Sequence, residues 1–224
     1  MKRPPADPAA FQEAVRWFRD RLPMTDDAFD ALDAQAYHKA FRVAGLAQLD
    51  MVTQVWEALD RAIAKGESME SFRAAVQDRL TAAWGKEMPW RVETIFRTNA
   101  QLAYSDARWE QMEHPAVKKA RPFRRFDAIM DSRTTDICAA LDGTVLPADD
   151  PFWGTHLPPL HFNCRSHQVS LTGREAEAEG IDDAAPEEQP TEGFGRAPTL
   201  RPPEPEPDLG GYPPALAAEY RRAA

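Results

Sequence analysis

The sequence predicts an α+β protein in three parts: a helical N-terminal region, a small α+β module with a short antiparallel sheet, and a disordered Pro-rich C-terminal tail. Apolar residues recur at helical spacing through the first part. Short alternating segments, separated by turn residues, follow in the second part. Nine of the twenty prolines lie after residue 172. These changes in pattern place the boundaries at residues 8–85, 86–172 and 173–224.

The N-terminal region has the pattern of consecutive amphipathic helices. One apolar stripe is predicted from residues three or four apart: Phe11, Val15, Phe18 and Leu22. Thr25, followed by two aspartates, has the composition of a helix start. From there we expect two helices that bend near Gly45 and end at Gly66. A further helix is predicted with Ser68 as its N-cap and Gly85 as its end.

The second part begins with a long helix and then changes character. Residues 89–113 predict a helix that Pro89 opens and that His114 and the following proline end. Strands are predicted at residues 123–130, 143–147 and 164–171, with a turn and a short helix between the first two. Gly143 is expected in a turn with positive φ.

Composition limits the classes of function. The chain has 224 residues and a net charge of −9, which argues against a protein whose whole surface binds nucleic acid. It contains no run of eighteen apolar residues, so we expect no membrane span. The first residues lack the apolar segment of a secretory signal, and two cysteines form no disulfide framework. Both features are typical of a protein in a reducing compartment.

The charge is unevenly distributed, and one short stretch is strongly basic. Residues 173–224 carry twelve acidic and five basic residues, whereas residues 84–133 carry seven acidic and ten basic ones. Five basic side chains fall within residues 118–125: Lys118, Lys119, Arg121, Arg124 and Arg125. Such a stretch is able to follow a phosphate backbone. The alternative is a solvated face beside an edge strand.

Cysteine and histidine gather in one region of the second part. His161, Cys164 and His167 lie three residues apart, and Cys138 lies upstream. Thiolate and imidazole are the ligands that zinc prefers, usually four in a tetrahedron. We therefore name Cys138, His161, Cys164 and His167 as candidate zinc ligands, with His156 as another source of the fourth ligand. Against this, three-residue spacing on a strand would place His167 and Cys164 on opposite faces.

Other interpretations of the same residues stay open. Cys138 and Cys164 are able to pair as a disulfide. Cys164 is also a candidate catalytic thiolate, with two histidines close in sequence and Arg165 beside it. The interpretation that the sequence favours is a pair of buried free thiols, with His161 bonded to the backbone of its loop.

A second group of residues suggests a structural network. Glu93 and Arg97 are four residues apart on a predicted helix, in the favourable acid-first order. The simple interpretation is a surface ion pair worth a few tenths of a kcal/mol. The stronger hypothesis is a half-buried network that docks this helix onto the β module through Asp131 or Arg133. The predicted network residues are Arg91, Glu93, Arg97, Thr98, Asp131, Asp136 and Gly143.

Five motifs occur together in an order that resembles one family. They are "FRVAG", "ESMESFR", "ETIFRTNAQLAYSDAR", "DSRTTDICAALDG" and "PPLHFNCRS". From about residue 10 to residue 171 the chain resembles the phage Mu F-like minor head proteins, also called phage head morphogenesis proteins. Many members of that family carry two further cysteines at the positions of Leu141 and Ser166. This departure argues against a site with four zinc ligands.

The resemblance implies a non-enzymatic minor capsid protein of a tailed phage or prophage. It implies association with the portal protein and other capsid components, and action in head morphogenesis, DNA packaging or ejection. It places the protein in the bacterial cytoplasm during assembly and then inside the capsid near the portal. The helical region would bind the portal, and the basic stretch would face packaged DNA. No small-molecule substrate is expected, and zinc is the one candidate cofactor.

Two further classes of function compete with this interpretation. One is a zinc-dependent or thiol hydrolase, such as a nuclease, which would use the cysteine and histidine residues. The other is a nucleic-acid-binding module that works outside a virion, which would use the basic stretch.

Overall fold

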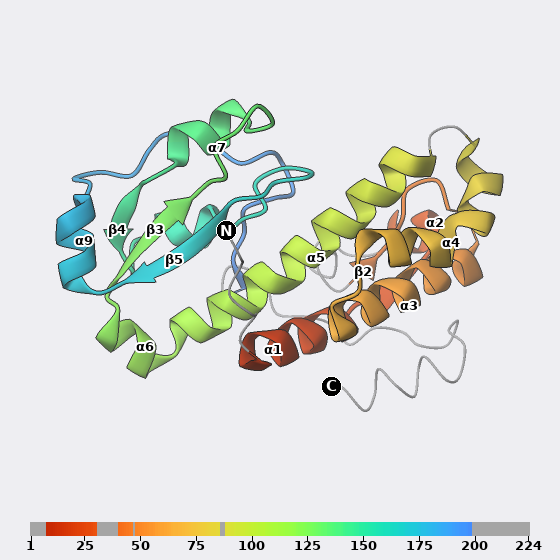
Figure 1. The fold of residues 1–224 in the computed structure, drawn as a ribbon, viewed down its shortest axis with the longest axis horizontal. Coiled ribbons are helices and arrows are strands. Elements are labelled where there is room, and N and C mark those ends of the chain that lie inside the picture. The colour runs from red at the N-terminus through yellow and green to blue at the C-terminus, as the bar shows by residue number, and fades with distance from the viewer. Residues whose placement is uncertain (1–7, 31–39, 47, 86–87, 199–224) are drawn as a thin grey trace. The chain divides into compact units, whose positions relative to one another are not determined.

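A computed structural model of the chain describes residues 8–30, 40–46, 48–85 and 88–198 (Figure 1). The chain divides into two compact units within helix α5 (Met88–Glu113), between residues 100 and 101. The boundary predicted from the sequence lies before this helix, after residue 85. The α+β class is confirmed. None of the helices in the described ranges has the length and apolar character that crossing a bilayer requires.

Helix α3 (Leu49–Lys65) is the centre of the first unit. It packs against α1 (Pro8–Arg19) and α4 (Met69–Trp84). Its buried face follows helical spacing, because the apolar residues recur every three or four positions: Val52, Val55, Trp56, Leu59 and Ile63. The helix ends at Gly66, as predicted, and this glycine adopts a left-handed conformation with φ 65°. The Ser68 hydroxyl accepts the backbone N–H of Ser71, which confirms it as the N-cap of α4.

Residues 40–46 correct the prediction of two helices that bend near Gly45. Helix α2 (Asp26–Asp30) is short, and residues 31–39 lie outside the described residues. Strand β2 (Ala40–Phe41) then pairs in parallel with β1 (Leu22–Pro23). The period of burial gives the reason. Phe41 and Val43 are buried while Arg42 and Ala44 are exposed, which suits an extended chain better than a helix.

The second unit contains a three-stranded antiparallel sheet, as the sequence predicts, and its strand order is β4-β3-β5. Strand β3 (Phe123–Asp127) is central and pairs with β4 (Val145–Pro147) and β5 (His167–Leu171). Helix α7 (Asp136–Leu141) connects β3 to β4, and Gly143 follows it with φ 81°, which confirms the predicted turn. Two short helices were not predicted: α6 (Pro115–Ala120) and α8 (Phe152–Thr155).

The two faces of this sheet are covered differently. Along β3, Arg124 and Phe126 are buried on one face, where Phe126 joins an apolar cluster with Trp109 of α5 and Trp153 of α8. On the other face, α9 (Gly173–Glu179) covers the sheet, and its Ala176 packs against Val145 and Leu171. The sheet is therefore the middle layer of the unit.

The chain stays ordered well beyond residue 172, which corrects the predicted start of a disordered tail. Helix α9 begins with a capping box between Thr172 and Glu175. Residues 181–198, which we call the C-terminal strap, then bond to α8 and to the segment after it: Ala197 N–H donates to Gly154 O, and Leu157 N–H to Gly195 O. Apolar composition does not reveal that such a segment is ordered, because backbone hydrogen bonds and not apolar side chains hold it in place. Residues 199–224 lie outside the described residues.

Gly195 tests whether the strap is an integral part of the fold. Its φ is 85°, and an added Cβ would lie 2.5 Å from Thr155 O. Gly195→Ala is expected to lower the free energy of unfolding in urea by more than the roughly 1–2 kcal/mol that a left-handed alanine costs alone.

Gly193→Ala is the matched control, because Gly193 has φ 87° and nothing within 4 Å of the added Cβ. Equal losses in the two variants would contradict a tightly packed strap.

Candidate functional site

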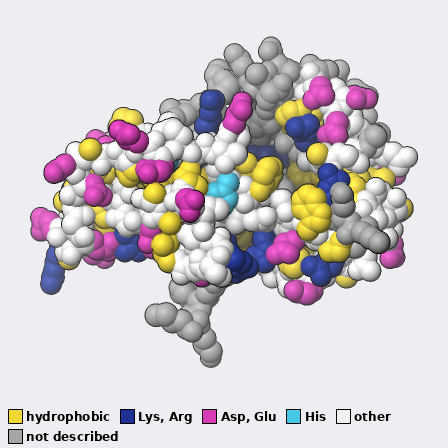
Figure 2. Space-filling model, turned by 90° about the horizontal axis from the view of Figure 1, so that it is seen from above, with side chains coloured by type: hydrophobic (Ala, Val, Ile, Leu, Met, Phe, Trp, Pro, Cys, Tyr) yellow, Lys and Arg dark blue, Asp and Glu magenta, His cyan; other side chains and the backbone are white. Residues whose placement is uncertain are grey.

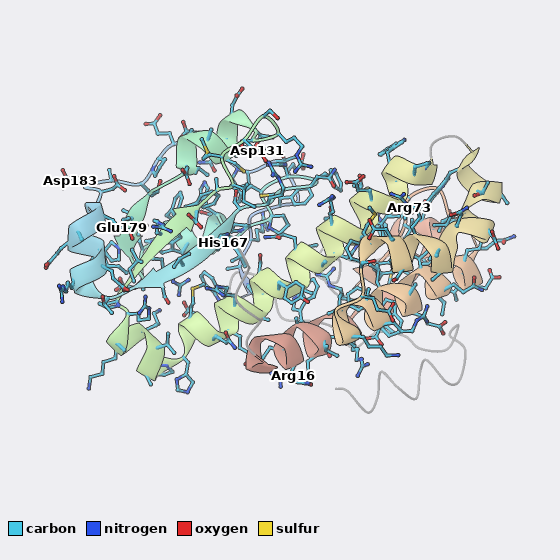
Figure 3. The ribbon with its side chains drawn as sticks, viewed as in Figure 1. Arg16, Arg73, Asp131, His167, Glu179 and Asp183 are labelled. Carbon is cyan, nitrogen blue, oxygen red and sulfur yellow. The ribbon has the colours of Figure 1, made fainter. Side chains whose placement is uncertain are left out.

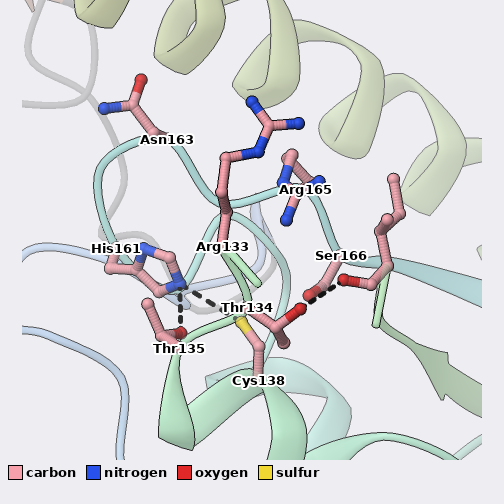
Figure 4. A pocket seen from close by; sticks show the side chains of 9 residues that line it. Arg133, Thr134, Thr135, Cys138, His161, Asn163, Arg165 and Ser166 are labelled. Carbon is pink, nitrogen blue, oxygen red and sulfur yellow. Dashed lines mark hydrogen bonds between the residues drawn. The ribbon is translucent and has the colours of Figure 1, made fainter. Parts of the chain in front are cut away.

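Three of the four predicted zinc ligands come together in the second unit. Cys138 Sγ lies 3.2 Å from His161 Nε2 and 3.8 Å from Cys164 Sγ. All three ligand atoms lie within 4.8 Å of one another. Figure 4 shows Cys138 on α7 facing His161 on the opposing loop, beside a small pocket. Both cysteines are buried free thiols, so the structure contains no disulfide between them.

A tight turn between α8 and β5 presents the two loop residues. Cys164 N–H donates to His161 O, and Asn163 between them adopts a left-handed conformation with φ 60°, which asparagine tolerates better than most residues. Cys164 therefore precedes β5. The prediction that Cys164 lies in this strand is wrong. From α5, Gln101 Nε2 donates to Ser166 O at 2.7 Å and fixes the chain just after the turn.

The other two histidines considered as ligands lie elsewhere. His167 begins β5 (Figure 3). Its Nε2 lies 2.9 Å from Asp127 Oδ2 on the neighbouring strand. Burial lowers the pKa of His167 more than Asp127 raises it. His156 is buried, stacks on Phe152 and contacts Glu188 O with Nε2 at 2.7 Å. Each has a structural partner outside the cysteine cluster.

The two cysteines share their protons unequally. The Cys164 thiol donates to Cys138, and contacts with Ser166, Thr135 and His161 also favour the thiolate, so the pKa of Cys138 falls to about 5 although burial opposes this. The same hydrogen bond, together with burial, raises the pKa of Cys164. The low-pKa thiol is thus Cys138, whereas the sequence analysis had named Cys164 as the candidate nucleophile.

An ion pair beside the cluster was not predicted. The guanidinium of Arg165 donates two hydrogen bonds to Asp131, at 2.6 and 2.7 Å. Asp131 also accepts the backbone N–H of Arg133, and these bonds, chiefly those from Arg165, hold the pKa of its carboxyl well below the usual range. The pair joins the loop before α7 to the turn that carries Cys164. The turn-forming composition of "DSRTT" was the available signal.

Within the predicted structural network, the structure shows an ion pair between Glu93 and Arg97 on α5. Arg97 Nε and Glu93 Oε1 are 2.7 Å apart, and both side chains are 39% exposed, so the pair contributes little to stability. Arg91 lies over the ring of Trp84, Thr98 is buried, and Asp136 lies in the first turn of α7. That these residues dock the helix onto the β module through Asp131 or Arg133 stays a prediction.

The basic stretch is largely neutralised within the second unit. Arg121 pairs with Glu175, Arg125 with Glu179 and Asp127, and Lys118 with Glu113. Lys119 is exposed. The stretch also leads into the central strand and not an edge strand. Figure 2 shows one face of the molecule, on which acidic and basic side chains are interspersed.

Arg124 corrects the prediction of a nucleic-acid contact. Its side chain is 1% exposed, pairs with Glu113, and lies with its guanidinium 4.4 Å from the centre of the Trp109 ring. Burial lowers its pKa, and Glu113 opposes this. A side chain in this position holds α5 against the sheet and is not available to a phosphate backbone.

Comparison with known proteins decides the family. Residues 53–169, slightly more than half of the chain, match the family described as "Phage Mu protein F like protein". The chain belongs to the phage Mu F-like family. It is 31% identical to the "Putative capsid assembly protein F" of Escherichia phage Mu over an alignment of 188 residues that covers 76% of this chain. It is 31% identical over 160 residues, 65% of its length, to the "Mu-like prophage FluMu F protein" of Haemophilus influenzae.

The Mu F-like match covers only part of these relatives. It spans 42% of the phage Mu protein and 38% of the Haemophilus influenzae protein. No solved structure shows a significant match to this chain. In the fold described here, the Mu F-like region runs from α3 into β5 and includes the three clustered residues. Leu141 lies in the apolar core, and Ser166 contacts Cys138.

Alkylation tests the assignment of the low-pKa thiol. In chelator-treated protein, the rate at which iodoacetamide modifies Cys138 at pH 6 should nearly equal its plateau rate at higher pH. The reason is that a thiol with a pKa of about 5 is already ionised at pH 6. Peptide mass spectrometry after timed quenching measures this. Cys164 in the same digest is the internal control and should stay unmodified. A Cys138 rate that climbs steadily through pH 8 would contradict the assignment.

Stability tests the role of Arg124. Arg124→Met should lower the free energy of unfolding by roughly 2 kcal/mol, because the hydrogen bonds of the buried guanidinium to Glu113 and Gln168 are lost. Urea denaturation measures this. Lys119→Met, at an exposed position of the same stretch, should change it by less than about 0.5 kcal/mol. Similar values for the two variants would show that Arg124 is not an anchor.

Proposed function

We propose that this protein acts in phage head morphogenesis as a capsid assembly protein. The observation that carries the proposal is membership of the Mu F-like family, together with a relative in phage Mu whose name describes capsid assembly. We extend it to the finer role that the sequence resemblance implies: a minor capsid protein that binds the portal protein and other capsid components. It would work in the host cytoplasm during assembly and remain inside the virion.

The architecture supports a role in protein–protein assembly. The first unit is helical and carries a large exposed aromatic side chain, Trp90, which is 57% exposed at the start of α5. Tryptophan and arginine are the residues that most often dominate protein interfaces. Arg91 follows it and lies 5.7 Å from the centre of its ring. We assign the portal-binding role to this helical unit.

Deletion of the gene in an inducible phage or prophage tests the proposed stage of action. Induced lysates without the protein should contain few or malformed heads by electron microscopy, and supply of the full chain should restore them. Well-formed heads without DNA would instead point to packaging, and filled heads that do not infect would point to ejection. An unchanged titre of infectious particles would contradict a role in the virion.

Trp90 tests the assignment of the binding unit. Trp90→Ala in the full chain should weaken co-purification with the portal protein by about tenfold or more, since truncation of an interface anchor typically costs about 2 kcal/mol. Met130→Ala is the matched control, because Met130 is equally exposed at 57% but lies in the second unit. Weakening by Met130→Ala alone would move the binding site to the second unit.

A further inference from the structure

We propose that Cys138, His161 and Cys164 bind a zinc ion with three protein ligands, and that solvent supplies the fourth. The site is independent of the proposed function, because it rests on ligand geometry alone. It also differs from the four-residue set that the sequence suggested, since His167 is bonded to Asp127 on another strand.

The spacing of the sulfur atoms fits a metal better than a disulfide. A disulfide requires about 2.05 Å between the sulfurs, whereas Cys138 Sγ and Cys164 Sγ are 3.8 Å apart. Two thiolates bound tetrahedrally to zinc, each at about 2.3 Å, are separated by about 3.8 Å. The distance of 3.2 Å from Cys138 Sγ to His161 Nε2 is slightly shorter than a zinc site needs, and a small rotation of the imidazole lengthens it.

His161 presents the correct nitrogen. Its Nδ1 lies 2.8 Å from the carbonyl oxygen of Phe162. A carbonyl only accepts hydrogen bonds, so Nδ1 carries the proton and Nε2 keeps a free lone pair. That lone pair faces Cys138 Sγ and Thr135 Oγ1. A backbone carbonyl on the second ring nitrogen is the usual orienting contact of a zinc-bound histidine.

The surrounding groups suit a cation with two thiolate ligands. Backbone hydrogen bonds from Leu160 and Ser166 reach the sulfur of Cys164, as they do around metal-bound thiolates. The nearby guanidinium of Arg165 would repel a cation, but both of its terminal nitrogens bind Asp131. The ion takes both sulfurs as thiolates, and the proton that they share passes to solvent.

The fourth position faces the pocket. Cys138 and His161 line it together with Thr135 and Asn163, and His161 is only partly buried, so an ion and a water molecule have access. Leu141, one turn after Cys138, is fully buried in the apolar core and offers no ligand. Three protein ligands and one solvent ligand complete the tetrahedron.

Metal content and cobalt substitution test the site. The full-length chain, purified without chelator, should contain about one zinc per molecule by mass spectrometry of the elements. After removal of zinc, Co²⁺ alone should give the charge-transfer absorption of cobalt–thiolate bonds and the intense visible bands of four-coordinate cobalt. Less than about 0.2 zinc per chain together with absent cobalt–thiolate absorption would overturn the proposal.

Matched histidine variants identify the ligand. His161→Asn should weaken zinc binding by about 100-fold or more, whereas His167→Asn should leave it within a few-fold of the original. Zinc should also raise the unfolding temperature of the original protein and of His167→Asn, but not that of His161→Asn. This thermal readout and circular dichroism of each variant separate lost binding from lost folding. Equal binding by both variants, or a Cys138–Cys164 disulfide in protein purified from reducing cytoplasm, would overturn the assignment.

Discussion

The second unit is organised around one buried charge, the guanidinium of Arg124 in the central strand. A cation that has lost its water must find partners inside the protein, because burial of an unpaired charge costs several kcal/mol. Here the partners are Glu113 and Trp109 on α5, together with Gln168 on β5. Gln168 in turn donates to the carbonyl of His156. One charge thus fixes the end of α5, the neighbouring strand and the start of the loop that carries His161.

The sequence predicted those elements whose burial follows a regular period. The stripe on α3, the cap at Ser68 and the turn at Gly143 all depend on residues close in the chain. The strand at residues 40–41 escaped prediction because its parallel partner lies eighteen residues upstream, as Leu22 pairs with Ala40. The strap was not predicted because its stability comes from backbone hydrogen bonds to residues 154–160. Amino-acid composition does not indicate such bonds.

The sequence predicted which residue types form the candidate site but not which of the histidines takes part. Three of the named ligands do converge: Cys138 on α7 with His161 and Cys164 in the turn before β5. Spacing argued against His167 only on the assumption that Cys164 lies in the strand, whereas the turn at Asn163 presents Cys164 and β5 begins at His167. Spacing also could not show that Asp131 neutralises Arg165 next to the two sulfurs, a contact between residues thirty-four positions apart.

The place of the strap in the sequence sets the order in which the parts of the site form during synthesis. Residues 188–197 hold the segment before His161 through bonds to His156, Leu157, Pro159 and Leu160, yet they are the last described part of the chain. During synthesis the cysteines and His161 leave the ribosome first, while the segment that shapes their loop is still being made. The loop therefore reaches its final form only after the chain has passed residue 197. A site near the middle of the sequence thus depends for its shape on residues that are synthesised after it.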